Sequence, residues 1–316
     1  MNVLSLFDGM SCGRIALDRL GVPVTKYYAS EIDKYAIQIA KKNYPDTIHL
    51  GDVTKIDNVP DTIDLLIGGS PCQGFSFAGN RLNFDDPRSQ LFFEFVRLLK
   101  TLKPKYFLLE NVKMKKESEA VITEMLGVEP IEINSNLVSA QSRRRLYWTN
   151  IPQDGLPEDK GIKLKDILED GFVTDRDKSH CIDAHYYKGG GMNNIRSYFN
   201  KSKRQIVFTP EGLCQVGEAD INGHDILKRV YHPEGKAPTL NTMNGGNREP
   251  KVAIDETHWR KLTPLECERL QTVPDGYTEG VSNTQRYKML GNGWTVDVIC
   301  HIFNGLRNEE NLQCVA

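Results

Sequence analysis

The feature that most constrains the fold is a short apolar run, Ile63–Ile67, that is followed directly by Gly68 and Gly69. The run shows no alternation of apolar and polar residues, which is typical of a strand covered on both faces in a parallel sheet, and we expect the glycines to end it. Similar runs occur at Val3–Phe7, Tyr27–Ser30 and Tyr106–Leu109. The pattern predicts an α/β fold with a doubly wound sheet, in which functional residues gather beyond the carboxyl ends of the strands.

The first strand leads into a turn that is suited to a nucleotide. Asp8–Gly13 follows it, and helical periodicity begins at Arg14. A strand, a glycine turn and a helix can hold a nucleotide, although a purely structural tight turn has the same pattern. Glu31 follows the turn by roughly 20 residues, where a carboxylate can accept hydrogen bonds from ribose hydroxyls. Asp52 ends a third such unit, within reach of an adenine amino group.

A cysteine and a glutamate come after the two central strands. Cys72 lies in a turn whose glycines and proline present the thiol; the alternative is a small buried hydrophobic residue, the commonest fate of a free cysteine. Glu110 follows Tyr106–Leu109 and reaches the same edge of the sheet. Buried carboxyls are rare unless they are paired or functional, and a salt bridge to Arg143 or Arg145 is the structural alternative.

Three motifs in order carry a family resemblance: Pro71–Ser76, Glu110–Val112 and Gln141–Arg145. Together they resemble the active-site set of the DNA cytosine-5 methyltransferases of bacteria and phages. The resemblance runs from about Asn2 to Thr149 and from about Arg260 to Leu306, and its first and last motifs are similar to those of vertebrate de novo DNA methyltransferases. It implies a Rossmann-like methyltransferase sheet with a second, smaller, loop- and β-rich target-recognition domain.

The resemblance implies S-adenosylmethionine as the cofactor, S-adenosylhomocysteine as its product, and no metal ion. Ser11 and Cys12 depart from the family, which usually has glycines there. An ordinary core tryptophan is the alternative for Trp294. The resemblance assigns cofactor contacts to Phe7, Gly9, Met10, Glu31, Ile32, Asp52, Val53, Pro71, Leu91, Asn292, Gly293 and Trp294.

By the same resemblance the catalytic residues are Cys72, Glu110, Arg143 and Arg145. Cytosine C5 is a poor nucleophile, and a Cys72 thiolate that adds to C6 turns the ring into an enamine. An unperturbed thiol pKa of about 8.5 leaves little thiolate at neutral pH, so positive charge from the two arginines would favour the anion. A protonated Glu110 could donate to ring N3, while Arg145 would hold O2 and Arg143 would position Glu110 or the backbone.

The target base must leave the duplex, because stacking covers both ring faces. The polar stretch Phe77–Ser89 predicts a mobile loop that can close over the substrate, with an idle surface connection as the alternative. A helix, Gln90–Leu102, should follow it and pack on the sheet. The DNA contacts expected around this loop are Gln73, Ser76 and Arg88.

The chain changes character after Pro152, where periodicity weakens and glycine pairs appear. We place a target-recognition domain at 155–259, between a catalytic and cofactor-binding domain, 1–154, and a return segment, 260–316, whose helix has Thr263 as its N-cap. Basic residues without any acid at Tyr187–Gln205 favour a DNA-facing surface, although a solvated basic face has the same composition. The DNA contacts expected in this domain are Lys201, Lys203, Arg204 and Thr239.

Charge, cysteine content and apolar runs restrict the partners and the cellular compartment that we expect for this chain. The formal net charge is −2, so phosphate contacts must come from local patches. Seven scattered cysteines without a Cys-x-x-Cys pair indicate reduced thiols and argue against structural zinc. No apolar run approaches the roughly 20 residues that span a membrane. We expect a monomer without membrane contact, located in the cytoplasm of a bacterium or phage-infected cell. Its expected partner is double-stranded DNA. A restriction endonuclease can accompany it but is not needed for activity.

Three other functions compete with DNA methylation. An RNA cytosine methyltransferase of the same fold has an almost identical active site. A DNA-binding regulator could keep the fold without catalysis, but Cys72, Glu110 and both arginines are present. A dinucleotide-dependent oxidoreductase would bind NAD and leave the Cys72 turn unexplained.

Overall fold

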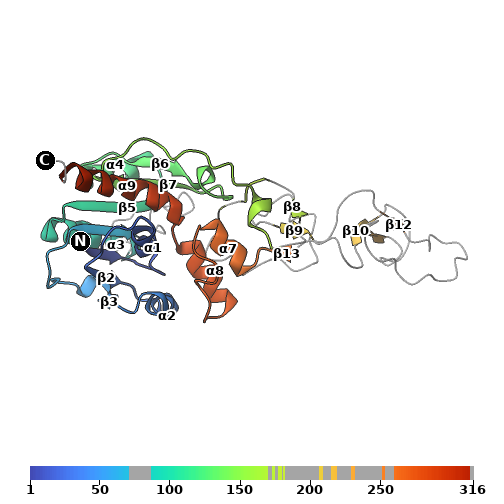
Figure 1. The fold of residues 1–316 in the computed structure, drawn as a ribbon, viewed down its shortest axis with the longest axis horizontal. Helices are drawn as coiled ribbons and strands as arrows, with labels where there is room; N and C mark the ends of the chain where they lie inside the picture. The colour runs from blue at the N-terminus through green and yellow to red at the C-terminus, as the bar shows by residue number, and fades with distance from the viewer. Residues whose placement is uncertain are drawn as a thin grey trace, which may run out of the picture.

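A seven-stranded sheet forms the centre of the protein (Figure 1). The computed structural model describes residues 1–70, 87–169 and 260–313, and between them the short segments 173–174, 177–179, 181, 206–208, 215–218, 229–231 and 251–252. The strand order is β3-β2-β1-β4-β5-β7-β6. The strands are β1 (Asn2–Leu6), β2 (Lys26–Ser30), β3 (Ile48–His49), β4 (Leu65–Gly69), β5 (Tyr106–Val112), β6 (Ile131–Asn134) and β7 (Arg144–Thr149).

Chain order in this sheet reverses between β1 and β4. The pairs from β3 through β5 are parallel, whereas β7 is antiparallel to both β5 and β6. Two neighbouring strands whose connections leave in opposite directions open a crevice at their carboxyl ends, which is where doubly wound sheets bind ligands. The predicted α/β doubly wound fold is therefore confirmed.

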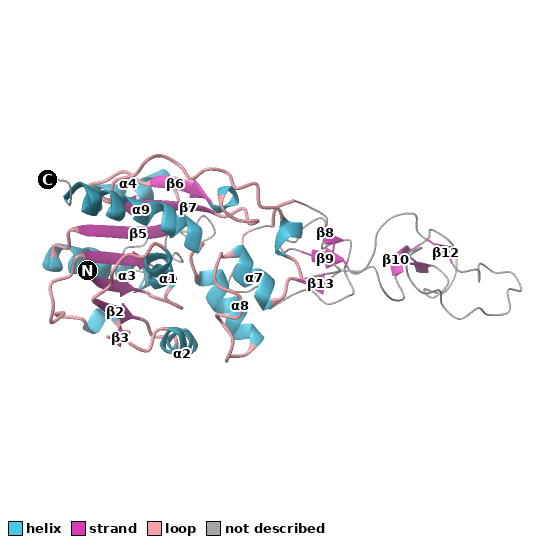
Figure 2. Ribbon diagram, in the orientation of Figure 1, coloured by secondary structure: helices cyan, strands magenta, loops and turns pink. Residues whose placement is uncertain are grey.

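Helices cover both faces of the sheet, which explains why its strands lack alternation (Figure 2). One face packs against α1 (Cys12–Arg19), α2 (Lys34–Asn43) and α9 (Val296–Gln313). The other packs against α3 (Pro87–Leu102) and α4 (Lys116–Leu126). In β1, Val3 belongs to the first core, and Leu4 and Leu6 belong to the second.

Strand β4 runs through the central glycines and ends at Gly69, two residues later than the predicted end at Ile67. Gly68 pairs with Leu109 and Gly69 pairs with Glu110, so both belong to β4. A Cβ on Gly68 would lie 3.1 Å from the carbonyl oxygen of Leu6 and 3.1 Å from the Phe95 ring, so these glycines serve close packing inside the sheet. Glu110 likewise lies within β5 and not after it.

The return segment begins at β13 (Arg260–Lys261) and continues into α7 (Pro264–Leu270), α8 (Asn283–Asn292) and α9. The predicted N-cap of α7 is confirmed: Thr263 Oγ1 accepts from the Glu266 amide at 3.2 Å, and Glu266 Oε2 accepts from the Thr263 amide at 2.8 Å. Short 3-10 helices occur at Val53–Lys55, Ser135–Leu137 and Leu164–Ile167. Helix α3 begins at Pro87, earlier than the predicted Gln90.

Two small sheets lie away from the main sheet along the long axis of the molecule (Figure 1). One joins β13, β9 (Ile206–Phe208) and β8 (Val173–Thr174). The other joins β10 (Gln215–Glu218), β11 (Arg229–Tyr231) and β12 (Lys251–Val252). Residues 77–86 of the predicted loop lie outside the described residues, and its last three residues, 87–89, belong to α3. In the described part of the chain, no helix has the length and apolar character that crossing a membrane requires.

Candidate active site

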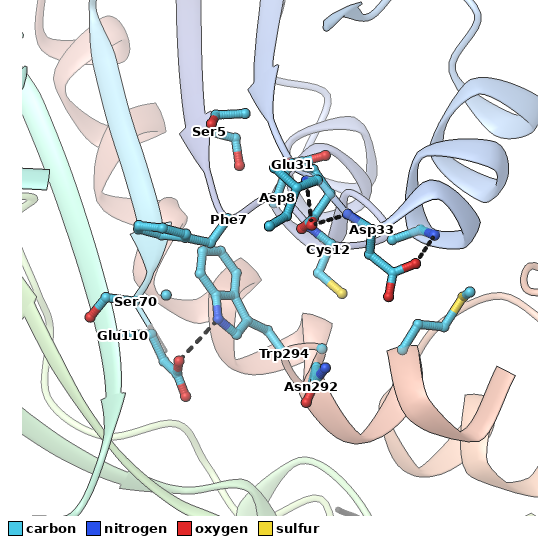
Figure 3. A pocket seen from close by; sticks show the side chains of 18 of the residues that line it. Ser5, Phe7, Asp8, Cys12, Glu31, Asp33, Ser70, Glu110, Asn292 and Trp294 are labelled. Atoms are coloured by element: carbon cyan, nitrogen blue, oxygen red, sulfur yellow. Dashed lines mark hydrogen bonds between the residues drawn. The ribbon is translucent and has the colours of Figure 1, made fainter. Parts of the chain in front are cut away.

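A cavity of about 620 Å³ opens at the carboxyl ends of β1 and β4 (Figure 3). Side chains that are far apart in the chain meet there because parallel strands end at the same edge. Glu110, Arg143 and Arg145 line it. The predicted cofactor contacts on its wall are Phe7, Gly9, Glu31, Ile32, Asp52, Val53, Leu91, Asn292, Gly293 and Trp294.

Glu31 is held in place by backbone amides. Its Oε2 accepts from the Gly9 amide at 2.8 Å, and its Oε1 accepts from the amides of Ile32 and Asp33 at 2.7 and 2.8 Å. A carboxylate offers about four lone-pair directions, so one remains for a ligand. Ile32 beside it is 76 % exposed, an unusual apolar surface on a cavity wall.

The first turn has Ser11 and Cys12 at the two positions where the family usually has glycines. Ser11 adopts a left-handed conformation with φ of 66°, where glycine is normally favoured, and its hydroxyl donates to Asp8 Oδ2 at 2.5 Å. Met10, to which the resemblance assigns a cofactor contact, does not line the cavity: its side chain is buried in the core, and its carbonyl accepts from the Tyr277 hydroxyl at 2.7 Å. Burial raises the pKa of the Cys12 thiol to about 12, which keeps it protonated.

Asp8 is a cavity residue that the sequence reasoning missed. It is buried and accepts from the Tyr27 hydroxyl at 2.8 Å as well as from Ser11. Burial raises its pKa to about 6 despite these hydrogen bonds. Its place directly after the first strand was a usable signal, since that position faces the crevice of a doubly wound sheet.

We expect Asp8 to make the fold less stable as the pH rises. Its usual pKa is 3.8 and its folded pKa is about 6, so between these values the folded protein keeps a proton that the unfolded chain has lost. Protonated Asp8 therefore adds to the free energy of unfolding in full below pH 3.8, and this contribution is lost as the pH rises past about 6. The total loss is roughly 3 kcal/mol. Urea denaturation at pH values from about 4 to about 7 measures this loss, and in Asp8→Asn the free energy of unfolding should fall by that much less over the same range. The same pH dependence in the variant would contradict the assignment.

Glu110 is held by a different partner on each oxygen. Arg145 Nε lies 2.9 Å from Oε1, and the Trp294 indole N–H donates to Oε2 at 3.2 Å. The salt bridge that the sequence offered is thus made with Arg145. Burial acts to lower the pKa of Arg145, but the negative charge of Glu110 and the smaller effects of Cys181 and Tyr147 together outweigh it, so the pKa is raised.

Arg143 binds the turn between α8 and α9. Its Nη2 donates to the Gly293 carbonyl at 2.9 Å, and its Nη1 donates to the Gly291 carbonyl at 3.3 Å and to Cys181 Sγ at 3.1 Å. Gln141, from the same motif, is fully buried and donates to Gln271 Oε1 at 3.2 Å. These contacts tie the arginine-bearing loop to the cavity wall at Gly293.

Gly69 leaves no space for a side chain beside Glu110. A Cβ there would lie 2.9 Å from Trp294 Nε1 and 3.0 Å from Glu110 Oε2. We expect Gly69→Ala to displace the carboxylate and lower kcat by about 10- to 100-fold, because small misplacements of reacting groups are costly. Gly68→Ala is the matched control: it crowds Leu6 and Phe95, away from the cavity, and should lower the melting temperature without changing the kcat of the folded enzyme. Equal kcat losses in the two variants would contradict this.

Several predicted residues lie outside the described part of the structure. They are Pro71, Cys72, Gln73, Ser76, the side chain of Arg88, Lys201, Lys203, Arg204 and Thr239. The last described residue before the Cys72 turn is Ser70, which is buried on the cavity wall and whose hydroxyl accepts from Asn111 Nδ2 at 3.1 Å. Ser70, two residues before Cys72 in the sequence, therefore lies beside Asn111, the neighbour of Glu110. Among the residues that are described, no group of three His, Cys, Asp or Glu side chains could hold a metal ion.

Comparison with known proteins gives one consistent family. The family model for C-5 cytosine-specific DNA methylase matches residues 1–308. A type II methyltransferase of Neisseria lactamica, M.NlaIV, is 36 % identical over 94 % of this chain and 96 % of its own. The orphan methyltransferase M.SPBetaI of Bacillus phage SPbeta is 29 % identical over 97 % of both chains.

Solved structures share the fold. The Entamoeba histolytica methyltransferase EhMeth aligns with a TM-score of 0.64 and 16 % identity over 98 % of both chains. A Spodoptera frugiperda DNMT2 variant aligns with a TM-score of 0.61 and 20 % identity over 96 % of this chain and 99 % of its own. With the family match over nearly the whole length, the chain belongs to the C-5 cytosine-specific DNA methylase family and is an S-adenosylmethionine-dependent DNA cytosine-5 methyltransferase.

Proposed function

We propose that the protein methylates C5 of a cytosine flipped out of double-stranded DNA, through a covalent bond between Cys72 Sγ and ring C6. The observation that carries the proposal is a single cavity with two chemically different walls. The Glu110–Arg145 pair offers donors and acceptors for a pyrimidine. Glu31, Ile32 and Asp52 offer carboxylates and an apolar surface for a nucleoside.

The residues of the second wall fit S-adenosylmethionine. The remaining acceptor direction of Glu31 suits a ribose hydroxyl, and exposed Ile32 suits the face of an adenine. Hydrogen bonds from the backbone and hydroxyl of Thr54 hold the pKa of Asp52 below its usual value, which keeps an acceptor for the adenine amine. When bound, this cofactor supplies an electrophilic methyl group on a sulfonium.

In the proposed reaction the protein's own side chains prepare the cytosine. The Cys72 thiolate adds to C6, and the electron density pushed into the ring is met at N3 by a proton or hydrogen bond from Glu110, which must take up a proton for this step. Arg145, bound to Glu110 through Nε, would hold O2 with another guanidinium nitrogen. After methylation, solvent takes up the C5 proton, the C5–C6 double bond re-forms as the Cys72 thiolate leaves C6, and the proton at N3 returns to Glu110.

We also propose the division into a catalytic domain, 1–154, a target-recognition domain, 155–259, and a return segment, 260–316. Support comes from α9, whose apolar residues join the core of α1 and β1 although it is distant in sequence. The small sheets set apart from the main sheet support a separate recognition unit (Figure 1).

Tritiated methyl transfer tests the substrate. We expect label from S-adenosylmethionine to enter duplex DNA, and bisulfite sequencing of DNA from expressing cells to place it on C5 of cytosines within one recurring sequence. Label in transfer RNA but not in DNA would contradict the proposal and favour the RNA-modifying alternative.

A further inference from the structure

We propose that Trp294 is a positioning residue for the reaction, whose indole N–H fixes the carboxylate of Glu110 from the cofactor side of the cavity. The proposal rests on the proposed role of Glu110. It assigns Trp294 a part in catalysis that neither a cofactor contact nor a core position requires.

The contact is a buried and directional one. Trp294 and Glu110 are each 8 % exposed, and the N–H lies 3.2 Å from Oε2 while Arg145 binds Oε1 (Figure 3). A buried indole N–H needs an acceptor, and a carboxylate can rotate about its terminal torsion unless both oxygens are held. Two donors on two oxygens therefore fix the plane of the Glu110 carboxylate.

The residues on both sides of Trp294 are held by hydrogen bonds. The preceding residue, Gly293, donates its amide to the Met289 carbonyl at 2.8 Å and accepts from Arg143 Nη2 at 2.9 Å. The following residue, Thr295, donates its hydroxyl to Gln271 Oε1 at 2.9 Å. Because both neighbouring residues are held, Trp294 is well placed to fix the position of Glu110.

One glycine makes room for the ring. A Cβ on Gly69 would lie 2.9 Å from Trp294 Nε1, whereas on its other side the ring is in ordinary contact with Gly13, where a Cβ would lie 3.6 Å from Cζ3. The indole thus lies between the first turn, which carries the cofactor wall, and the strands that carry Glu110. Preorganisation of this kind lowers the cost of reaching the transition state, so it should act on kcat more than on binding.

The test is Trp294→Phe, which keeps an aromatic ring and removes the donor. We expect kcat to fall about 10-fold, as for loss of one hydrogen bond to a charged group, with KM for duplex DNA and the Kd for S-adenosylhomocysteine changed by less than about threefold. In a Glu110→Gln background the same change should lower kcat no further. Trp148→Phe is the matched control, because that buried indole donates to Thr123 at 2.9 Å in the other core.

A spectroscopic readout reports the contact without turnover. The chain has three tryptophans, and Trp294→Phe identifies one indole N–H signal in protein labelled with nitrogen-15. Glu110→Gln should shift that signal and leave the Trp148 signal in place. An unshifted signal, an unchanged kcat, or a loss confined to cofactor Kd would each overturn the proposal. If Glu110→Gln also keeps the full kcat of the parent, the proposed catalytic role of Glu110 fails together with that of Trp294. If Glu110→Gln lowers kcat, any of these three results overturns only the proposed role of Trp294.

Discussion

Replacing Cys72 with serine should abolish methyl transfer, with kcat at least about 10⁴-fold lower, as found when an enzyme loses its nucleophile. A hydroxyl is hardly ionised at neutral pH, so it cannot add to C6 as a thiolate does. Binding of S-adenosylhomocysteine should stay within about threefold of the original Kd by calorimetry, because the carboxylates of the cofactor wall are unchanged. A serine variant with kcat within about tenfold of the parent would contradict the covalent reaction.

Cys300→Ser is the matched control for this experiment. Cys300 lies in α9 and does not line the cavity, and burial raises the pKa of its thiol to about 11. A thiol that stays protonated cannot act as a nucleophile at neutral pH. We expect its replacement to leave kcat unchanged, which separates loss of the nucleophile from a general effect of removing sulfur.

Replacing Glu110 with glutamine should lower kcat by about 10²- to 10³-fold, within the usual range for loss of a positioned acid or base. The amide keeps the volume of the side chain and one oxygen for Arg145, so the fold should survive. The stability cost should stay below the about 3 kcal/mol expected when a buried ion pair loses one partner outright. Rapid-quench measurement of tritiated methyl transfer gives the rate, and urea denaturation gives the free energy of unfolding.

Glu132→Gln is the matched control, because it removes the charge of an ion-paired glutamate that lies away from the cavity. Glu132 lies on β6, outside the cavity wall, and binds Lys113 at 2.7 Å on the surface. Exposed ion pairs contribute little, so this variant should keep both kcat and stability. Full activity in Glu110→Gln would instead remove Glu110 from the proposed reaction.

The layered fold could be predicted because it depends on local patterns. Runs such as Val3–Phe7 lack alternation because both faces of the sheet are covered by apolar cores, with Val3 in one and Leu4 and Leu6 in the other. The capping box at Thr263 was predictable because both of its partners lie within one helical turn. The convergence of Glu31, Asp52 and Glu110 on one cavity followed from the common direction of their strands.

The features that sequence reasoning missed depend on contacts between distant segments. Gly69 pairs with Glu110 within β4, and Trp294 and Glu110 fill the space that a side chain on Gly69 would need. The first turn directs the Met10 side chain into the core, although the resemblance assigns this residue a cofactor contact. Asp8 owes its raised pKa to burial, which its sequence neighbours do not reveal.

Covalent trapping on DNA that contains 5-fluorocytosine tests the proposed reaction most directly. Fluorine at C5 cannot leave as a proton does, so the bond between Cys72 Sγ and C6 should persist after methylation. With S-adenosylmethionine present, the parent protein should form a denaturant-resistant complex with such a duplex at its target sequence, and Cys72→Ser should form none. An enzyme that methylates ordinary DNA yet forms no such complex, or a serine variant that still forms it, would contradict the account.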